Sequence, residues 1–233
     1  MTRTLTPSVQ PGPGQLDTAA KVLRERLNAL GSKATVKVHG EALSVRATPS
    51  ELAALRPVLS VGRLEVRQVL EIGGPGAGTE PGGQAYTAAV FARLGCTVPV
   101  DPARLAPAAS DAVACSRDGA MTFHLGRPEL GPTDIIGASA GRDATGTQAQ
   151  VRIRFTSGGQ DRWTSLTRKT FSSLPPTNQV AFVVDGVVFS APVIQAVITG
   201  DADLSGSFTT AQAKELAAEL GSGPLPFALQ LQP

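Results

Sequence analysis

The stretch QVAFVVDGVVFSAPVIQAVI, residues 179–198, is the longest apolar run in the sequence and limits which folds are available. Its length suits a membrane-spanning helix, which needs about 20 mainly apolar residues. Asp185 lies near its centre, however, where a charged side chain costs roughly 2.5 to 3.5 kcal/mol on insertion scales. Asp185-Gly186 is also the dipeptide that a two-residue hairpin turn favours, because glycine adopts positive φ without a Cβ clash. Since β-branched and aromatic residues flank it on both sides, the pattern predicts a β-hairpin.

Strands that are apolar at nearly every position are covered on both faces, so we expect two helices to pack against this hairpin. The first covers residues 159–174, after the strand-like segment 151–155. Its apolar stripe consists of Trp163, Leu166, Thr170, Phe171 and Leu174. The second begins at Thr209, which has capping-box spacing to Gln212, and ends at Gly221. The segment PFALQLQ (226–232) alternates as a final strand should.

The N-terminal region shows a different pattern. Residues 17–30 carry a helical leucine stripe capped by Asp17, residues 34–40 and 42–48 are strand-like, and TPSE (48–51) starts a second helix. GRLEVRQVL (62–70) alternates as a half-buried strand. This order is a ferredoxin-like split βαββαβ unit that lacks its first strand. Either TRTLTPSV (2–9) or PFALQLQ is expected to supply it.

The sequence therefore predicts an α+β protein with two units. Residues 1–72, completed by 225–233, are expected to form the ferredoxin-like unit. Residues 73–133 are expected to be a linker and insertion that contains both cysteines, because Gly and Pro are dense at 71–83 and proline recurs around 99–110. Residues 134–224 are expected to form a second α+β unit, in which two helices pack on the hairpin.

No pattern in the sequence predicts an enzyme, a metal site or nucleic-acid binding. The formal charge is +2, with 21 basic and 19 acidic residues scattered along the chain, which does not suit a phosphate backbone. Ser139 lies in GASAG (137–141), the pattern of a nucleophile elbow, but no helical periodicity follows it and both histidines precede it. His39 and His124 lack partners at metal-ligand spacing. We expect no catalytic residue, cofactor or metal.

The two cysteines, Cys96 and Cys115, lie in the loop-like region. A disulfide between them would close a loop of about 20 residues and stabilise the fold by about 3 kcal/mol in the chain-entropy model. Spacing alone does not distinguish this from two free thiols. The N-terminal segment MTRTLTPSVQPGPG lacks the apolar core of a signal peptide, so we expect a cytoplasmic chain or a piece of a longer protein.

The C-terminal region resembles the first extracytoplasmic domain, called P1, of the protein-export subunit SecD. The resemblance runs nearly position for position over residues 179–226. It is carried by Asp185-Gly186, Ser190-Ala191-Pro192, Gly200, Ser205-Gly206, Phe208-Thr209, Ala213, Leu216-Ala217, Leu220 and Gly223 to Pro226. VLRERLNALG (22–31) and GRLEVRQVL resemble N-terminal segments of the same family more loosely. Together the resemblance covers residues 17–70 and 130–229.

The resemblance implies a ferredoxin-like base subdomain and a head subdomain, outside the cytoplasmic membrane beside the SecYEG channel and a SecF-like subunit. It implies that the domain engages unfolded preprotein and assists its translocation without catalysis. The full-length protein would be tethered to the membrane, and this chain itself would be soluble. An extracytoplasmic location also favours a disulfide between Cys96 and Cys115.

An exporter holds varied unfolded chains without recognising their sequence, so we expect an apolar, backbone-accessible groove or edge strand near the hairpin. The expected partner contacts are Val187, Phe189, Val193, Ile194 and Ile198. The residues expected to shape turns and caps are Asp185, Gly186, Pro192, Gly206 and Thr209. Because the family's membrane spans are not in this sequence, the alternative is a free-standing SecD-like ligand-sensing or scaffold lipoprotein domain without export activity.

Overall fold

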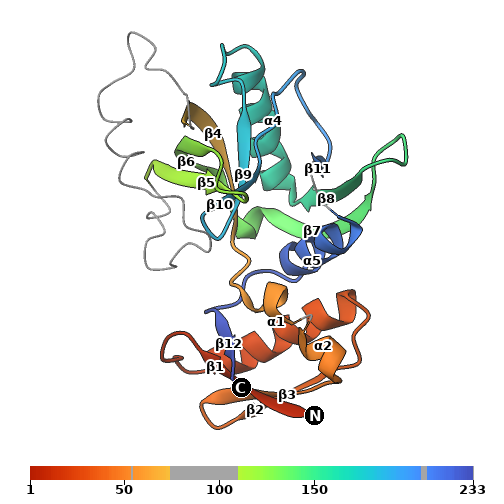
Figure 1. The fold of residues 1–233 in the computed structure, drawn as a ribbon. Coiled ribbons are helices and arrows are strands. Elements are labelled where there is room, and N and C mark those ends of the chain that lie inside the picture. The colour runs from red at the N-terminus through yellow and green to blue at the C-terminus, as the bar shows by residue number, and fades with distance from the viewer. Residues whose placement is uncertain (54, 74–109, 206–208, 233) are drawn as a thin grey trace. The chain divides into compact units, whose positions relative to one another are not determined.

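A computed structural model gives the fold of the 233-residue chain, of which residues 1–53, 55–73, 110–205 and 209–232 are described (Figure 1). The chain forms two compact units. The first unit consists of Met1–Arg63, Ile135–Arg154 and Asp203–Pro233, and the second consists of Leu64–Asp134 and Phe155–Ala202. Each unit is thus built from segments that are distant in the sequence.

The first unit contains a sheet of four strands in the order β12-β1-β3-β2, counted over the described residues. The strands are β1 (Thr2–Pro7), β2 (Thr35–His39), β3 (Ala42–Arg46) and β12 (Leu229–Leu231). All neighbouring strands are antiparallel, with Leu5 of β1 facing Leu43 of β3 and Leu231 of β12. Both candidates for the missing strand therefore enter this sheet, at adjacent positions.

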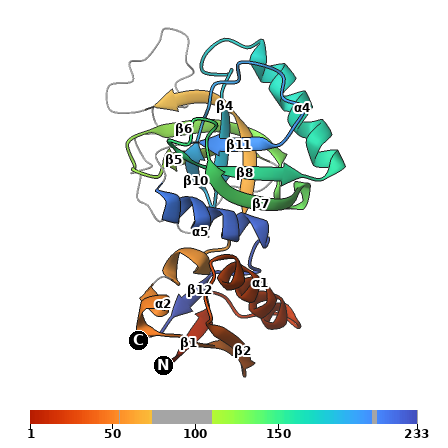
Figure 2. The same ribbon diagram turned by 90° about the vertical axis from the view of Figure 1, so that its right-hand side faces the viewer.

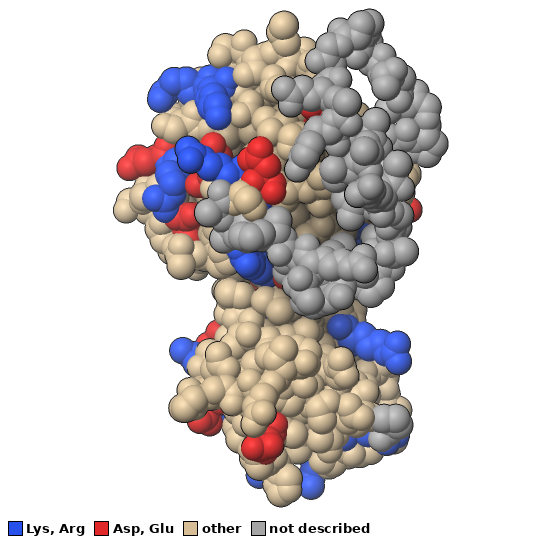
Figure 3. All heavy atoms as spheres, turned by 90° about the vertical axis from the view of Figure 1, so that its left-hand side faces the viewer, with Lys and Arg blue, Asp and Glu red and all other residues tan. Residues whose placement is uncertain are grey.

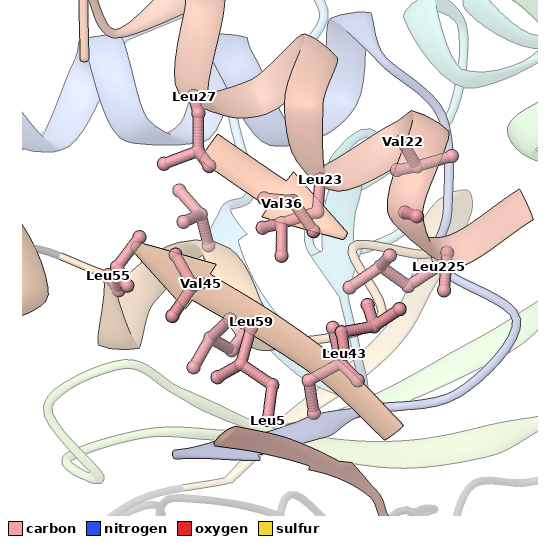
Figure 4. Close-up of a cluster of buried hydrophobic side chains, with 14 of the residues drawn as sticks. Leu5, Val22, Leu23, Leu27, Val36, Leu43, Val45, Leu55, Leu59 and Leu225 are labelled. Atoms are coloured by element: carbon pink, nitrogen blue, oxygen red, sulfur yellow. The ribbon is translucent and has the colours of Figure 1, made fainter. Parts of the chain in front are cut away.

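Helices cover one face of this sheet and bury an aliphatic core. They are α1 (Gln15–Ala29), α2 (Pro49–Ala53) and the 3₁₀ helix η1 (Arg56–Leu59). Figure 4 shows Leu23 and Leu27 of α1 directed toward Val45 and Leu43 of β3, and all four are buried. Each such side chain contributes roughly 1.5 to 3 kcal/mol of transfer free energy. Helix α1 begins after Gly14, which has φ 72°, so Asp17 lies in the first turn rather than at the cap.

A buried arginine joins the helices of the first unit to the segments that follow them. Arg26 of α1 has no exposed surface, and its guanidinium donates to the carbonyls of Val58, Ser60 and Val61 at 2.7 to 2.8 Å. It also donates to the carbonyl of Gly223 at 3.0 Å, and lies 3.8 Å from the carboxylate of buried Glu219. Two chain segments are therefore fixed to α1 by one side chain.

We expect Arg26→Met to lower the free energy of unfolding of the first unit by roughly 3 to 5 kcal/mol, because the Glu219 carboxylate loses a buried cation. Far-UV circular dichroism during urea unfolding measures this. Lys21→Met, on the exposed side of the same helix, should change the free energy by no more than about 0.5 kcal/mol. If the two substitutions lowered the free energy of unfolding equally, the buried hydrogen bonds and ion pair of Arg26 would not stabilise the first unit.

The start of α2 is the capping box expected from TPSE. The backbone N–H of Thr48 donates to the Glu51 carboxylate at 2.8 Å, and the Glu51 N–H donates to Thr48 Oγ1 at 3.3 Å. Ser32 and the Lys33 N–H donate to the other carboxylate oxygen at 2.8 and 2.9 Å. These hydrogen bonds, led by the one from the Thr48 backbone, lower the pKa of Glu51 from 4.5 to about 2.

Because the pKa of Glu51 is lower in the folded chain, its stabilising contribution is complete above pH 4.5 and disappears as the pH falls toward 2. We therefore expect Glu51→Gln to flatten the acid dependence of stability in this window. Carboxyl chemical shifts followed by NMR should give a Glu51 midpoint near 2. A midpoint near 4.5 would mean that the capping box does not persist in solution.

The first unit also contains α5 (Thr210–Gly221) and a sheet of order β11-β8-β7 (Figure 2). Its strands are β7 (Ile135–Arg142), β8 (Ala149–Phe155) and β11 (Ala202–Ser205). Helix α5 approaches β7 closely, since a Cβ on Gly221 would lie 3.2 Å from the backbone N and O of Ala138. The apolar side of α5, expected to cover the hairpin, therefore packs on β7 within the first unit.

The second unit is built on a closed sheet of strands in the order β10-β5-β6-β4-β9. The strands are β4 (Leu64–Gly73), β5 (Ala112–Ser116), β6 (Thr122–Leu130), β9 (Val180–Val184) and β10 (Val187–Ser190). Two sequence expectations are therefore wrong. The segment 62–70 does not complete the four-stranded sheet, and residues 112–116 and 122–130, expected within a linker and insertion, are strands. Apolar alternation identifies a strand but not the sheet that it joins.

The hairpin forms where the sequence predicts it. Asp185 and Gly186 have φ values of 48° and 80°, which is the pattern of a two-residue turn with positive φ at both central positions. β9 pairs antiparallel with β10 and with β4, and β10 pairs in parallel with β5. Both strands are paired on each side, so neither is an accessible edge strand, which was one of the two alternatives expected there; the other, a groove, is a separate question.

Helix α4 (Ser157–Phe171) packs on the closed sheet through Trp163 (Figure 2). The Trp163 ring lies 5.9 Å from the Phe155 ring and 5.8 Å from the Phe182 ring of β9. Thr156 caps the helix by accepting from the Gly159 N–H at 3.0 Å. The helix turn at Gly159 touches η3 (Pro132–Asp134) so closely that a Cβ there would lie 2.6 Å from the Asp134 carbonyl oxygen.

We expect Gly159→Ala to destabilise the second unit by roughly 1 to 3 kcal/mol, because the added methyl overlaps backbone atoms. Unfolding followed by the fluorescence of Trp163, the chain's single tryptophan, reports on this unit. Gly158→Ala is the matched control, since its Cβ would meet only Arg162 Nη1 at 4.0 Å. If both variants unfold like the parent chain, the close packing of α4 on η3 does not exist in solution.

Candidate functional site

An extended segment connects the hairpin to β11 and lies against α4 in the second unit. We call residues 191–200 the strap; its one strand-like contact is an isolated bridge between Val193 and Gln179. Near that bridge, the Ile194 N–H donates to the Asn178 carbonyl at 2.9 Å, and the Pro192 carbonyl accepts from Val180 at 3.1 Å. Backbone hydrogen bonds thus fix the first part of the strap.

Side chains of α4 hold the second part of the strap. Thr164 Oγ1 donates to the Ile198 carbonyl and Thr167 Oγ1 accepts from the Ile198 N–H, both at 3.0 Å. Gln160 Nε2 donates to the Gly200 carbonyl at 3.0 Å. These three α4 residues are spaced four and three positions apart, so they lie on one side of the helix. We call Gln160, Thr164 and Thr167 the polar row of α4.

Apolar side chains are exposed on the strap, at the last residue of α4 and in the loop that follows α4. Val193 is 47% exposed, Val197 is 37%, Phe171 is 50% and Leu174 is 81% exposed. We call these four residues the apolar surface of the second unit. A single exposed aliphatic residue is common on a soluble protein. Two of the four lie on the strap, which contacts α4, and two lie at and just after the end of α4, so we treat them as a candidate binding surface.

The structure separates the five expected partner contacts into accessible and buried residues. Val187 and Ile194 are buried, with 8% and 5% exposure. Val193 is exposed, and Phe189 and Ile198 are half-buried. Val187 is buried on the face of β10 opposite to Val188, which belongs to the core cluster of the closed sheet, and Ile194 is the buried residue of the strap. These two residues would reach a partner only if the strap or the sheet rearranged.

Phe189 is partly covered by a neighbouring turn. The Arg117 guanidinium carbon lies 5.0 Å from the Phe189 ring centroid, which is a cation–π distance. Arg117 is held in the β5–β6 turn, where Asp118 accepts from the Ser116 hydroxyl and from the Ala120 N–H at 3.0 Å. The hydrogen bond from Ser116, followed by that from Ala120, lowers the pKa of Asp118. The turn is therefore ordered around a negative charge.

The residues expected to shape turns have local roles where the structure describes them. Asp185 and Gly186 form the hairpin turn, and the Pro192 carbonyl accepts a hydrogen bond at the strap's start. Thr209 caps α5, accepting from Gln212 N–H at 3.2 Å while its own N–H donates to Gln212 Oε1 at 2.9 Å. Gly206 lies outside the described residues. Cys115 is disulfide-bonded, and Cys96 lies outside the described residues.

Phe171 and Leu174 are the surface residues that sequence analysis assigned wrongly. The helical stripe of the sequence placed both on the buried side of a helix extending to residue 174. The helix ends at Phe171 instead, with Ser172 at the C-cap, so Leu174 lies in the loop before Pro175 and Pro176. The double proline was the available signal, because a residue before proline is disfavoured in helical conformation.

The residues weighed as chemical sites do not assemble one among the described residues. Ser139 is exposed on β7, not on a strand-to-helix turn. His124 lies about 4 Å from the carboxylates of Glu71 and Asp111, at 4.0 and 3.9 Å. The described part of the chain contains no group of three or more His, Cys, Asp or Glu side chains with the arrangement of a metal site. None of its helices is long and apolar enough to span a bilayer.

Charged side chains of both signs are interspersed on the described part of the face in Figure 3. This agrees with the formal charge of +2. A nucleic-acid interface needs a concentration of basic side chains that this face does not have among its described residues. The apolar surface is therefore the feature that carries the functional argument.

Comparisons with known proteins identify the same region. The family model described as SecDF, P1 head subdomain, matches residues 111–227, which include α4, the hairpin and the strap. The chain is 32% identical over 123 residues to protein translocase subunit SecD of Streptomyces coelicolor, covering 51% of this chain and 22% of that protein. It is 36% identical over 108 residues to protein translocase subunit SecDF of Thermus thermophilus, covering 46% of this chain and 14% of that protein.

Solved structures resemble the whole chain. A crystal structure of SecDF in a super-membrane-facing form superposes with a TM-score of 0.68 and 27% identity, covering 100% of this chain and 29% of that one. A structure described as a membrane component SecDF that enhances protein export gives a TM-score of 0.63 and 27% identity, covering 98% of that chain. The mixed α+β fold is therefore that of these structures. The matched regions span less than a quarter of the two curated relatives above.

Proposed function

The chain belongs to the SecDF P1 head family, and from this premise we propose that it is a non-catalytic, extracytoplasmic domain of a SecD-like component of the Sec export machinery. In this role it binds emerging preprotein and assists its translocation. The observation that carries the proposal is the apolar surface of the second unit, which lies within the residues that the family model matches. The relatives, which are named as protein translocase subunits, support it.

The exposed residues suit a partner that presents varied apolar side chains. Val193, Val197, Phe171 and Leu174 offer hydrophobic contact, which is not directional and does not require a particular partner sequence. Half-buried Phe189 and Ile198 extend this contact. Unfolded preprotein exposes such side chains along its length, whereas a folded protein hides most of them. The surface therefore discriminates by folding state rather than by sequence.

The proposed role also includes an assembly with other export components at the membrane. The full-length protein is tethered to the cytoplasmic membrane and works beside SecYEG and a SecF-like subunit. The four-stranded sheet of the first unit serves as a ferredoxin-like base, which its order β12-β1-β3-β2 supports. A disulfide of Cys115 supports an extracytoplasmic location, because disulfides persist in oxidising compartments.

Site-specific photocrosslinking tests this function in membranes engaged with an arrested export substrate. A photoreactive amino acid at Val197 or Leu174 of the full-length protein should give adducts with the substrate. The matched control is Val38, which has the same residue type and nearly the same exposure as Val197, 39% against 37%, but lies in β2 of the first unit. Adducts at Val38 as strong as those at Val197, or none at either second-unit position, would contradict the proposal.

A further inference from the structure

The contacts between α4 and the strap have an unusual selectivity for the backbone. The polar row of α4 contacts the N–H and C=O of Ile198 and the C=O of Gly200, all at 3.0 Å. No side-chain polar atom of the strap takes part in these contacts. The polar row therefore recognises the main chain of an extended segment, and any residue except proline offers the same N–H and C=O groups.

The hydroxyl group of Thr167 is itself oriented by the helix. Thr167 is fully buried, and its Oγ1 donates to the Thr164 carbonyl at 3.1 Å while it accepts from the Ile198 N–H. That internal bond directs a lone pair of the hydroxyl toward the strap. Thr164 Oγ1 supplies the complementary donor. A donor and an acceptor thus contact the C=O and the N–H of the same residue, as a residue of a neighbouring antiparallel strand does in a hydrogen-bonded pair.

The strap has one buried side chain, and Ala191, Pro192 and Ile198 are half-buried. Ile194 is its buried anchor, whereas Val193 and Val197 are exposed. Asn178, whose carbonyl accepts from Ile194, has a buried Oδ1 without a hydrogen-bond partner among the described residues. The Asn178 Oδ1 atom, close to where the strap is held by Ile194, therefore remains an unused hydrogen-bond acceptor among the described residues. A segment with few buried side chains opens at low free-energy cost.

We propose that the polar row of α4 is a receptor for the main chain of extended polypeptide, which the strap occupies in the free protein and a preprotein segment occupies after displacing it. This inference rests on the proposed function and specifies how the client is held. The client presents an extended backbone to Thr164 and Thr167 and an aliphatic side chain in place of Ile194. The strap thus acts as an internal competitor that keeps the receptor covered between clients.

A competing strap makes a quantitative prediction about the anchor. The probe is a fluorescein-labelled polypeptide kept unfolded by carboxymethylation of its cysteines, titrated against the 233-residue chain and followed by anisotropy. Ile194→Ala weakens the strap but leaves the polar row intact, so the probe should bind roughly tenfold more tightly. Ile153→Ala, at a fully buried position of β8 in the first unit, is the control for general destabilisation.

The polar row is tested in the same background. Adding Thr164→Val and Thr167→Val to Ile194→Ala should abolish the gain, because the strap is already displaced in that background and only the probe loses main-chain contacts. In the parent chain the two valines should change affinity little, since strap and client lose the same hydrogen bonds. Amide hydrogen exchange gives an independent readout: the Ile198 N–H should exchange faster when the probe saturates the parent protein.

The outcomes separate the two proposals. If the probe binds the parent chain, but Ile194→Ala changes nothing or acts like Ile153→Ala, the strap does not compete and the inference is overturned. Continued protection of the Ile198 N–H in the bound state overturns it as well, while the proposed function stands. If the probe binds neither the parent nor the Ile194→Ala chain, the proposed function itself fails.

Discussion

The two-residue turn at Asp185 and Gly186 is the constraint on which the second unit depends. Both residues have positive φ, a conformation that costs most residues roughly 1 to 3 kcal/mol and glycine almost nothing. The turn reverses the most apolar stretch of the chain so that β9 pairs with β4 and β10 pairs with β5. Without that reversal, the five strands could not close into one sheet.

Closure has a consequence for function. Because each strand of the closed sheet has a neighbour on both sides, the sheet offers no open edge to which a client could add a strand. The surface that we propose for recognition therefore lies outside the sheet, on the strap and at the end of α4. Residues 180–184 and 187–190 are unavailable to a partner because they are paired strands of the sheet. Residues 191–200, from which Pro192 and Gly200 help to exclude regular strand, do not continue the β ladder and can contact a partner.

The sequence predicted elements well where a local signal has one physical meaning. Thr48 with Glu51, Thr209 with Gln212, and Asp185 with Gly186 act through hydrogen bonds or dihedral angles within a few residues, and the structure contains all three. Sheet membership was not predictable in this way. Residues 64–73 read as a strand correctly, but their partners at 122–130 and 180–184 lie far along the chain. Many segments of the sequence are apolar enough to form strands, so apolar content does not show which distant strand pairs with residues 64–73.

The candidate site shows the same division between local and distant information. The sequence predicted a binding region near the hairpin, but it could not show which of the residues there face solvent, because Ile194 and Val193 are adjacent and chemically alike. Their difference arises from the bridge to Gln179, which directs one side chain inward and the other outward. Thr164 and Thr167 carried no sequence signal as ligands, since a threonine in a helix ordinarily bonds its own backbone. Their contacts with the strap depend on the tertiary structure, which places the strap beside α4. Helix α4 therefore uses two sides. Its buried side packs on the sheet through Trp163, and the adjacent side binds the backbone of the strap, which is 31 or more residues away in the sequence.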